Sequence, residues 1–267
     1  MKIGNKLFED NRTNIMGILN VTPDSFSDGG KFSEISAALK HAEEMIKDGA
    51  VIIDIGGEST RPGYTKISDE EEIDRVAPII EAVKLNFDIP VSIDTYKSKV
   101  AEAAIKSGAD MVNDIWGLKY DADMANVVSR YNSAVCIMHN RKEAVYSDFL
   151  NDVKNDLTES IAIAKNHGIS DEKIVLDPGV GFAKSLEQNL LITNKLETLS
   201  DLGYPILLGT SRKSMIGLTL DLPVTERVEG TLATTVLACI KGALFVRVHD
   251  IKENYRVIKM TEAIINS

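Results

Sequence analysis

The feature that most constrains the fold is a local pattern that recurs along almost the whole chain. An amphipathic helical stripe is followed by a glycine and then by a short apolar strand that ends on a polar residue. The first copy has apolar residues at helical spacing from Ile35 to Ile46, then Gly49, then the strand Val51-Ile52-Ile53-Asp54. Glycine just past a helix is a common left-handed cap, and Gly108, Gly168, Gly203 and Gly242 precede later predicted strands in the same way. Further predicted strands lie at 91–94, 111–114, 135–139, 174–177, 206–209 and 244–249.

Strands that alternate with helices predict parallel strands joined by crossover helices. With the opening strand at 15–19, about eight strands in about 250 residues favour a (β/α)₈ TIM barrel, and a doubly wound open sheet is the alternative. A second helical stripe at 73–83 follows Ser68 and Glu71, a possible capping box. We expect residues 1–267 to form a single domain, with residues 1–14 as an N-terminal hairpin or arm that turns at Gly4-Asn5.

Net charge and cysteine usage narrow the class of partner. The formal net charge of -10 disfavours nucleic acid and anionic membranes as partners, so any bound anion needs a local basic cluster. Cys136 and Cys239 lie in apolar runs without metal-ligand spacing, as expected of reduced, buried thiols. Neither a signal peptide nor an apolar run long enough to span a bilayer is evident. We therefore expect a cytoplasmic protein with small-molecule substrates.

Polar residues end nearly every predicted strand, which is where the active site of such a barrel forms. One such residue would be ordinary loop chemistry, but their recurrence predicts a common mouth. Arg247 lies between Val246 and Val248 and needs an anionic partner. Asp94 is interpreted in the same way, as a functional residue. The strand-end residues are Asn20, Asp54, Asp94, Asn113, His139, Asp177, the run 209–213, Arg247 and His249.

Four residues are interpreted differently: two that end strands and two histidines in helical segments. Asp54 lies deeper than the others, before Ile55, and fits an orienting partner better than a direct ligand contact. His139 stays open between a functional and a structural role. His41 and His167 fall in helical segments and are expected at the surface.

Two chemistries are predicted at the mouth. Cationic groups suit phosphate oxygens; they are Arg61, Lys213, Arg247 and His249. Carboxylates and an amide suit the donor and acceptor edges of a planar heterocycle; they are Asp94, Asn113 and Asp177. Serine-hydrolase, P-loop and dinucleotide fingerprints are absent from the sequence, as is a zinc-ligand cluster.

Several motifs resemble those of the dihydropteroate synthase family. The longest are MGILNVTPDSFSDGG at 16–30, GGESTRPG at 56–63 and SIDT at 92–95. Shorter matches follow in order at 113–114, 138–139, 176–182, 211–214 and 246–249. The resemblance implies a (β/α)₈ barrel that joins 6-hydroxymethyl-7,8-dihydropterin diphosphate to 4-aminobenzoate, releasing 7,8-dihydropteroate and diphosphate. It also implies a homodimer packed through late helices, and mobile loops after Asn20 and Gly57.

The resemblance also implies roles for residues at the matching positions. The implied pterin-binding set is Asp94, Asn113, Ile115, Met138, Asp177, Gly209 and Lys213. The implied diphosphate-binding set is Asn20, Thr60, Arg61, Arg247 and His249, with Mg²⁺ at Asn20. The implied aminobenzoate contacts are Thr60, Pro62, Phe182, Lys213 and Ser214. Catalysis is assigned to Asp94, Lys213, Arg247 and His249, in an S_N1-like displacement without a covalent enzyme intermediate.

One departure and two alternatives accompany this reading. After His139 the chain reads Asn-Arg-Lys-Glu, without the glycine that many members place there, so the shape of the fifth loop is open. A related barrel that transfers a methyl group from methyltetrahydrofolate to a corrinoid would not need the diphosphate-binding cations. A non-catalytic pterin-binding paralogue would be expected to have lost Lys213, Arg247 or Asn20. We also expect the monofunctional form, without a fused pyrophosphokinase or aldolase.

Overall fold

The computed structural model describes residues 1–9, 12–21, 30–58 and 66–267. Within these residues, eight parallel strands form one sheet in the order β8-β7-β6-β5-β4-β3-β10-β9. An isolated parallel bridge between Leu176 and Ile206 joins β8 to β9 and closes the sheet. The predicted (β/α)₈ barrel is therefore confirmed, and the doubly wound alternative is wrong.

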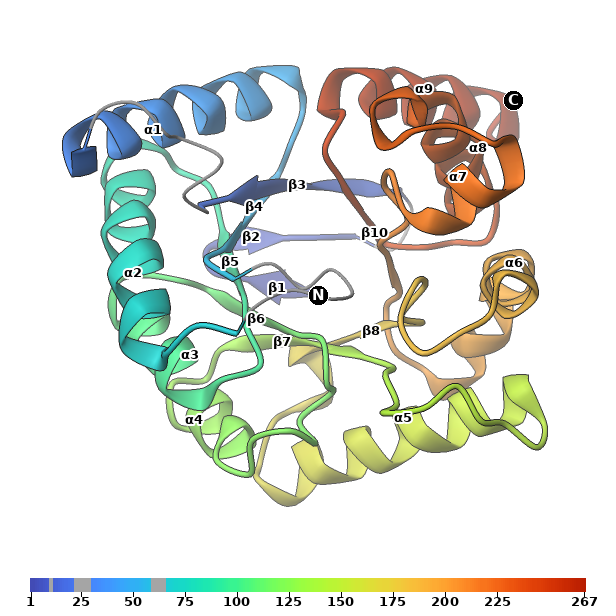
Figure 1. Cartoon of the computed structure of the whole chain (residues 1–267), viewed down its shortest axis with the longest axis horizontal. Coiled ribbons are helices and arrows are strands. Elements are labelled where there is room, and N and C mark those ends of the chain that lie inside the picture. Colours follow the sequence, from blue (N-terminus) through green and yellow to red (C-terminus); the bar gives the residue numbers. More distant parts are fainter. Residues whose placement is uncertain (10–11, 22–29, 59–65) are drawn as a thin grey trace.

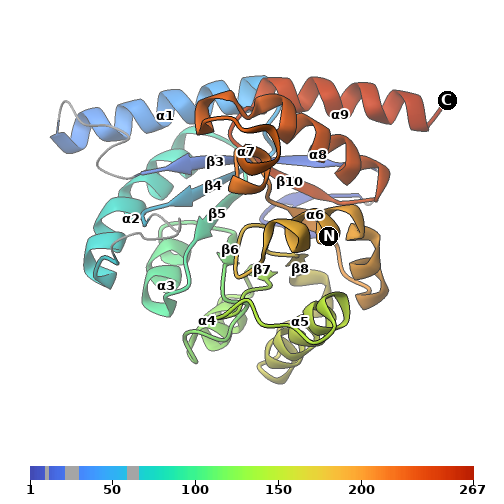
Figure 2. The ribbon, with the colours of Figure 1, turned by 45° about the vertical axis from the view of Figure 1, so that its right-hand side comes forward.

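The elements follow one another around the barrel in chain order, with the helices outside the strands (Figure 1). The strands are β3 (Asn14–Asn20), β4 (Ile52–Gly56), β5 (Val91–Asp94), β6 (Met111–Asp114), β7 (Ala134–Met138), β8 (Ile174–Asp177), β9 (Leu207–Leu208) and β10 (Phe245–Val248). The α-helices are α1 (Gly30–Asp48), α2 (Asp69–Asn86), α3 (Ser98–Lys106), α4 (Met124–Arg130), α5 (Phe149–Asn166), α6 (Leu186–Asn194), α7 (Ser214–Leu220), α8 (Val228–Ile240) and α9 (Ile251–Ile265). The first and last helices, α1 and α9, contact each other where the ring closes (Figure 2).

Local signals explain where the helices begin and end. The five glycines predicted as caps all have positive φ, from +73° to +114°, which a glycine adopts without steric cost; they are Gly49, Gly108, Gly168, Gly203 and Gly242. At the start of α2, Ser68 Oγ accepts a hydrogen bond from the Glu71 amide at 3.1 Å. The Glu71 carboxylate pairs with Arg75, so the capping box forms only on the serine side. No described helix is long and apolar enough to cross a membrane.

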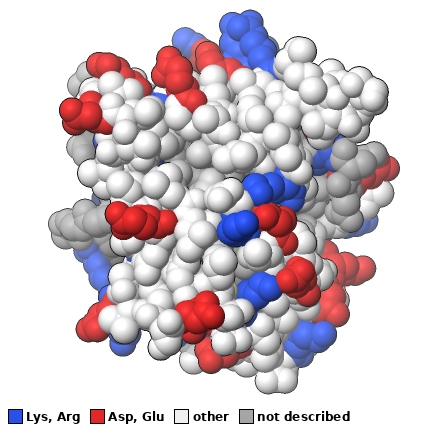
Figure 3. Space-filling view, turned by 90° about the vertical axis from the view of Figure 1, so that its right-hand side faces the viewer, with Lys and Arg blue, Asp and Glu red and all other residues white. Residues whose placement is uncertain are grey.

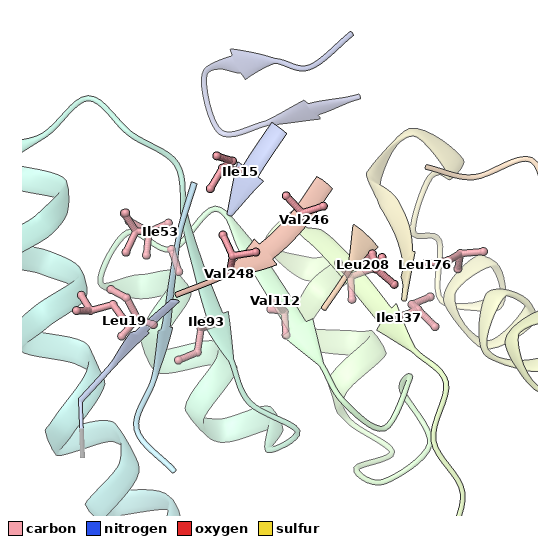
Figure 4. Close-up of a cluster of buried hydrophobic side chains, with 14 of the residues drawn as sticks. Ile15, Leu19, Ile53, Ile93, Val112, Ile137, Leu176, Leu208, Val246 and Val248 are labelled. Atoms are coloured by element: carbon pink, nitrogen blue, oxygen red, sulfur yellow. The ribbon is translucent and has the colours of Figure 1, made fainter. Parts of the chain in front are cut away.

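Strand alternation separates two apolar layers. Outward-facing residues pack under the helices in one large cluster that includes Ile15, Ile53 and Val112 (Figure 4). Inward-facing residues at the amino ends of the strands form a second cluster that includes Met16, Met111 and Phe245. The polar strand-end residues lie at the opposite end of the barrel from this second cluster.

The N-terminal hairpin fills the bottom of the barrel. Strands β1 (Lys2–Ile3) and β2 (Lys6–Leu7) pair antiparallel around a turn at Gly4-Asn5, where Gly4 has φ +56°. Ile3 and Phe8 belong to the inner apolar cluster, and the Phe8 ring meets the Phe245 ring edge-on at 5.1 Å between centroids. The hairpin thus seals the amino end of the strands and leaves the carboxyl end for the site.

Candidate active site

Inward-facing polar side chains from four strands meet at the carboxyl end of the barrel. Arg247 of β10 is central. Its Nε donates to Asp54 Oδ2 of β4 at 2.6 Å, and its Nη2 donates to Asp94 Oδ2 of β5 at 2.6 Å. Asn113 of β6 donates from Nδ2 to the same Asp54 oxygen at 3.2 Å. The anionic partner that Arg247 needed is thus a pair of carboxylates, and Asp54 is the orienting partner that the sequence predicted.

Burial controls the charges of this group. Asp54 is fully buried and Asp94 is 7% exposed. Burial raises the pKa of Asp94 to about 7, although the Arg247 guanidinium opposes the rise. Burial lowers the pKa of Arg247, but the carboxylates of Asp54 and Asp94 outweigh it and the pKa lies above its usual value. Asp94 Oδ1 is buried without a hydrogen-bond partner among the described residues, so it is available to a ligand.

A second charged pair lies across the mouth. Asp177 ends β8 and accepts a hydrogen bond from the Gly179 amide at 2.7 Å. A Cβ added at Gly209 would lie 3.4 Å from Asp177 Oδ2 and 3.8 Å from Lys213 Nζ, so this glycine keeps open the space beside both groups. Burial lowers the pKa of Lys213 to about 8, with Asp177 opposing it. Burial raises the pKa of Asp177 against the effect of Lys213.

Apolar side chains form a wall beside the polar groups. Tyr96, Ile115 and Met138 form one buried cluster, and Trp116 and Phe182 pack against it. Lys213 Nζ lies 4.9 Å from the centroid of the Phe182 ring. Polar groups below and an apolar wall beside them suit a flat heterocycle whose edge hydrogen-bonds and whose face does not.

The remaining predicted residues lie at the rim. His249 is held by Ser211, whose Oγ accepts from the His249 amide at 3.1 Å and lies 3.0 Å from His249 Nδ1. Asn20 is exposed at the end of β3, and Ser214 is exposed at the start of α7. Thr60, Arg61 and Pro62 lie outside the described residues, as do Thr22 to Gly29 of the first motif.

His139, whose role the sequence left open, contacts Asp156 and Lys184 through its two ring nitrogens. Its Nε2 lies 2.9 Å from Asp156 Oδ2 of α5, and its Nδ1 lies 2.8 Å from Lys184 Nζ. Burial lowers the pKa of His139 to about 3, so the ring is neutral. His41 is exposed on α1 and His167 is exposed just after the end of α5, so both are at the surface as expected.

Sequence reasoning missed two groups of residues near the site. The buried Glu58 accepts from Tyr96 Oη at 2.6 Å and pairs with Lys97 Nζ at 2.8 Å, beside the apolar wall. The other is Lys184, in the loop between β8 and α6. Glu58 lies within the motif at 56–63, and Lys184 lies two residues after the motif at 176–182. In both cases the available signal was a charged residue near a glycine-rich strand end.

Comparison with known proteins agrees with this geometry. The family model described as pterin binding enzyme matches residues 16–249. The chain is 63% identical to the dihydropteroate synthase of Clostridium beijerinckii, over 99% of each chain. The chain belongs to the dihydropteroate synthase family. It is therefore an enzyme, of the transferase class.

Other members of the dihydropteroate synthase family are also similar to the chain. The Bacillus subtilis protein is 54% identical over 96% of this chain and 90% of its own length. Among solved structures, the Clostridium difficile enzyme, crystallised in the presence of pteroic acid, superposes with a TM-score of 0.93 at 54% identity, over 96% of this chain and 98% of that one. The Yersinia pestis enzyme, in a complex with a sulfonamide drug, has a TM-score of 0.94 at 38% identity, over 100% and 99%.

Proposed function

We propose that this member of the family condenses 6-hydroxymethyl-7,8-dihydropterin diphosphate with 4-aminobenzoate and releases diphosphate. The observation that carries the proposal is the joint placement of Asp94, Asn113, Asp177 and Lys213 around one mouth, next to Arg247. Relatives support the two substrates, because the Clostridium difficile structure was determined in the presence of pteroic acid and a Xanthomonas albilineans structure with 4-aminobenzoic acid.

The pterin ring is assigned to the polar floor. Asp177 accepts paired hydrogen bonds from the ring amine and its neighbouring N–H, and Asn113 can both donate and accept. Lys213 donates to the oxygen or nitrogen edge of the ring. Ile115, Met138 and Gly209 form the walls of the pocket. Each buried polar contact of this kind contributes about 1–3 kcal/mol of discrimination, by analogy with the readout of bases.

The diphosphate is assigned to the rim, beside Arg247, His249 and Asn20, together with Thr60 and Arg61. Mg²⁺ is proposed here because it prefers hard oxygen ligands, keeps several waters and commonly binds through substrate phosphates rather than an all-protein cage. The exposed amide of Asn20 fits that requirement as a single protein ligand. When bound, the ion would neutralise charge on the leaving diphosphate.

The displacement needs no enzyme nucleophile. Arg247 and His249 neutralise the developing charge on the diphosphate as the carbon–oxygen bond breaks. The resulting pterin methylene cation is delocalised over the ring, and the carboxylate of Asp94 stabilises it. The amine of 4-aminobenzoate then attacks, with Phe182, Ser214, Lys213, Thr60 and Pro62 as its proposed contacts. Trapping of a pterinyl-enzyme adduct would contradict this sequence of steps.

The test of the function is diphosphate release from the pterin substrate, measured with and without 4-aminobenzoate and Mg²⁺. We expect 4-aminobenzoate and Mg²⁺ each to stimulate release. Release that 4-aminobenzoate does not stimulate would contradict the proposal. Methyl transfer from methyltetrahydrofolate in the same assay conditions would favour the corrinoid-dependent class of barrel instead.

We also propose that the enzyme is a homodimer that packs through α6, α7 and α8. A cavity of about 420 Å³ lies between these helices and is lined by Leu190, Leu191, Met215 and Leu237, among others. Leu190 and Leu191 are 42% and 38% exposed. The side of the barrel that carries these helices has a broad area without charged side chains (Figure 3). Exposed apolar area of this kind marks association surfaces.

Sedimentation equilibrium tests the dimer. Leu191→Glu is expected to give a monomer, because burial of an unpaired carboxylate is costly. Leu85→Glu, on the exposed face of α2, is the matched control and should leave the mass unchanged. A wild-type monomer would contradict the proposal.

The free, buried thiols of Cys136 and Cys239 support the proposed cytoplasmic location.

A further inference from the structure

Lys184 lies in the loop between β8 and α6, seven residues after Asp177, and all three of its ammonium protons have acceptors. Its Nζ donates to the Gly179 carbonyl at 2.9 Å, to the Phe182 carbonyl at 3.0 Å and to His139 Nδ1 at 2.8 Å. An ammonium has three donors and no acceptor, so this arrangement satisfies it completely. Such a set of contacts differs from the loose surface pairing of most lysines.

The loop around Lys184 is wound in a way that needs support. Gly179, Gly181 and Ala183 have φ of +68°, +88° and +44°, so every second residue is left-handed. This winding turns the carbonyls of Gly179 and Phe182 toward one point, where the ammonium lies. A residue with a Cβ is strained in the left-handed region, and Ala183 adopts that conformation here. The Gly179 backbone also packs against His139, because an added Cβ would lie 1.9 Å from the His139 carbonyl oxygen.

The same loop makes three contacts to the proposed pterin pocket. The Gly179 amide donates to Asp177 Oδ1, and the Val180 carbonyl accepts from Lys213 Nζ. The Phe182 ring lies beside Lys213 Nζ. A change in the path of this loop would therefore displace the carboxylate and the ammonium that are assigned to the pterin edge.

The groups behind Lys184 fix its orientation. Because His139 Nδ1 accepts from the ammonium, the ring proton is on Nε2, which donates to Asp156 Oδ2. Asp156 also accepts from Arg141 Nε. The charged groups that face Lys184 are Asp177, Lys213, Asp156 and Arg141, and burial lowers the pKa of Lys184 to about 7.

We propose that Lys184 is a positioning residue for pterin binding. It holds the carbonyls of the β8–α6 loop so that Asp177 and Lys213 face the pterin edge, and it contacts no substrate itself. Its main action is on the ground-state binding of the pterin, since the contacts of Lys184 and of this loop reach Asp177 and Lys213 but not Arg247 or Asp94. The proposal rests on the proposed function for the identity of the ligand.

The test compares Lys184→Met with Lys195→Met, an exposed lysine just after α6 that serves as the matched control. Loss of the ammonium leaves the two loop carbonyls without a donor, which should raise KM for the dihydropterin diphosphate about ten- to hundredfold. We expect kcat to fall by a smaller factor than KM rises, since Lys213 also serves in catalysis while a change in KM reports lost ground-state binding. Lys195→Met should match the wild type in both parameters.

A purely structural role would give a different result. Partial unfolding reduces the fraction of active enzyme, so kcat would fall while KM stayed unchanged. If Lys184→Met does not fold, Lys184→Gln retains two donors and should raise KM by a smaller factor. If the folded variants keep the wild-type KM while the wild-type enzyme releases diphosphate, the inference about Lys184 is wrong and the proposed function stands. Absence of diphosphate release from the wild type would instead overturn the proposed function.

Discussion

Replacement of Arg247 by methionine tests the charge balance at the centre of the barrel. The substitution removes the guanidinium to which Asp54 and Asp94 are both bound at 2.6 Å, while it keeps an unbranched side chain. Removal of one member of a buried ion pair costs about 3–5 kcal/mol, because the remaining charge is buried and uncompensated. We expect the free energy of unfolding of Arg247→Met to fall by about this amount at pH 8.5.

The loss of unfolding free energy caused by Arg247→Met should increase with pH. Burial raises the pKa of Asp94 to about 7 in the folded protein, and without Arg247 it should rise further. A carboxyl whose folded pKa exceeds its unfolded value of about 4 contributes stability that is present at low pH and is lost as pH rises to the folded pKa. In the wild type the stability contributed by protonated Asp94 is fully lost near pH 7, whereas in the variant it continues to be lost above pH 7. The deficit of the variant should therefore grow by about 1.4 kcal/mol for each pH unit above 7.

The assay is urea-induced unfolding, followed by far-ultraviolet circular dichroism at pH 6.5 and pH 8.5. Equal m values would show that both proteins unfold between comparable states. The control is Arg256→Met, an exposed arginine on α9, which should leave stability almost unchanged at both pH values. The same deficit for Arg247→Met at both pH values would refute the reasoning about Asp94.

Three further predictions concern other parts of the molecule. A plot of kcat/KM against pH should rise as Asp94 ionises near pH 7 and fall as Lys184 and Lys213 lose their protons near pH 7 and pH 8; Lys213→Met should remove the part of the fall near pH 8. Phe8→Ala should lower the free energy of unfolding in urea by about 3–5 kcal/mol without changing either KM, because Phe8 lies at the closed end of the barrel. Chelation of Mg²⁺ should reduce diphosphate release more than about tenfold, yet leave calorimetric binding of free pterin unchanged.

Local sequence was sufficient to predict the architecture. The glycine caps and the apolar runs are short-range features, and the five glycines predicted as caps have the expected backbone conformation. Asp94 and Asn113, which end successive predicted strands, are paired in register on β5 and β6. A polar residue at a strand end therefore already indicates that it faces the mouth of a barrel.

Position at a strand end does not determine what a side chain contacts there. His139 directly follows β7 and Asp94 ends β5, but the His139 ring contacts Asp156 and Lys184 whereas Asp94 binds Arg247. The difference arises because α5 places a carboxylate behind His139, and no local pattern in the strand encodes that helix packing. Lys184, in a glycine-rich loop, would be taken for a surface lysine until the loop carbonyls around it are seen.

The sequence by itself determined the fold class, the family and the set of polar residues at the mouth, because these depend on periodicity and contiguous motifs. Only the tertiary structure decided how the charges pair. Arg247 meets Asp54 and Asp94 across 193 and 153 residues of chain, and closure of the barrel brings them within 2.6 Å. The physical reason is that a buried charge is stabilised by whichever opposite charge the closed barrel brings into contact with it, and sequence distance carries no information about that contact.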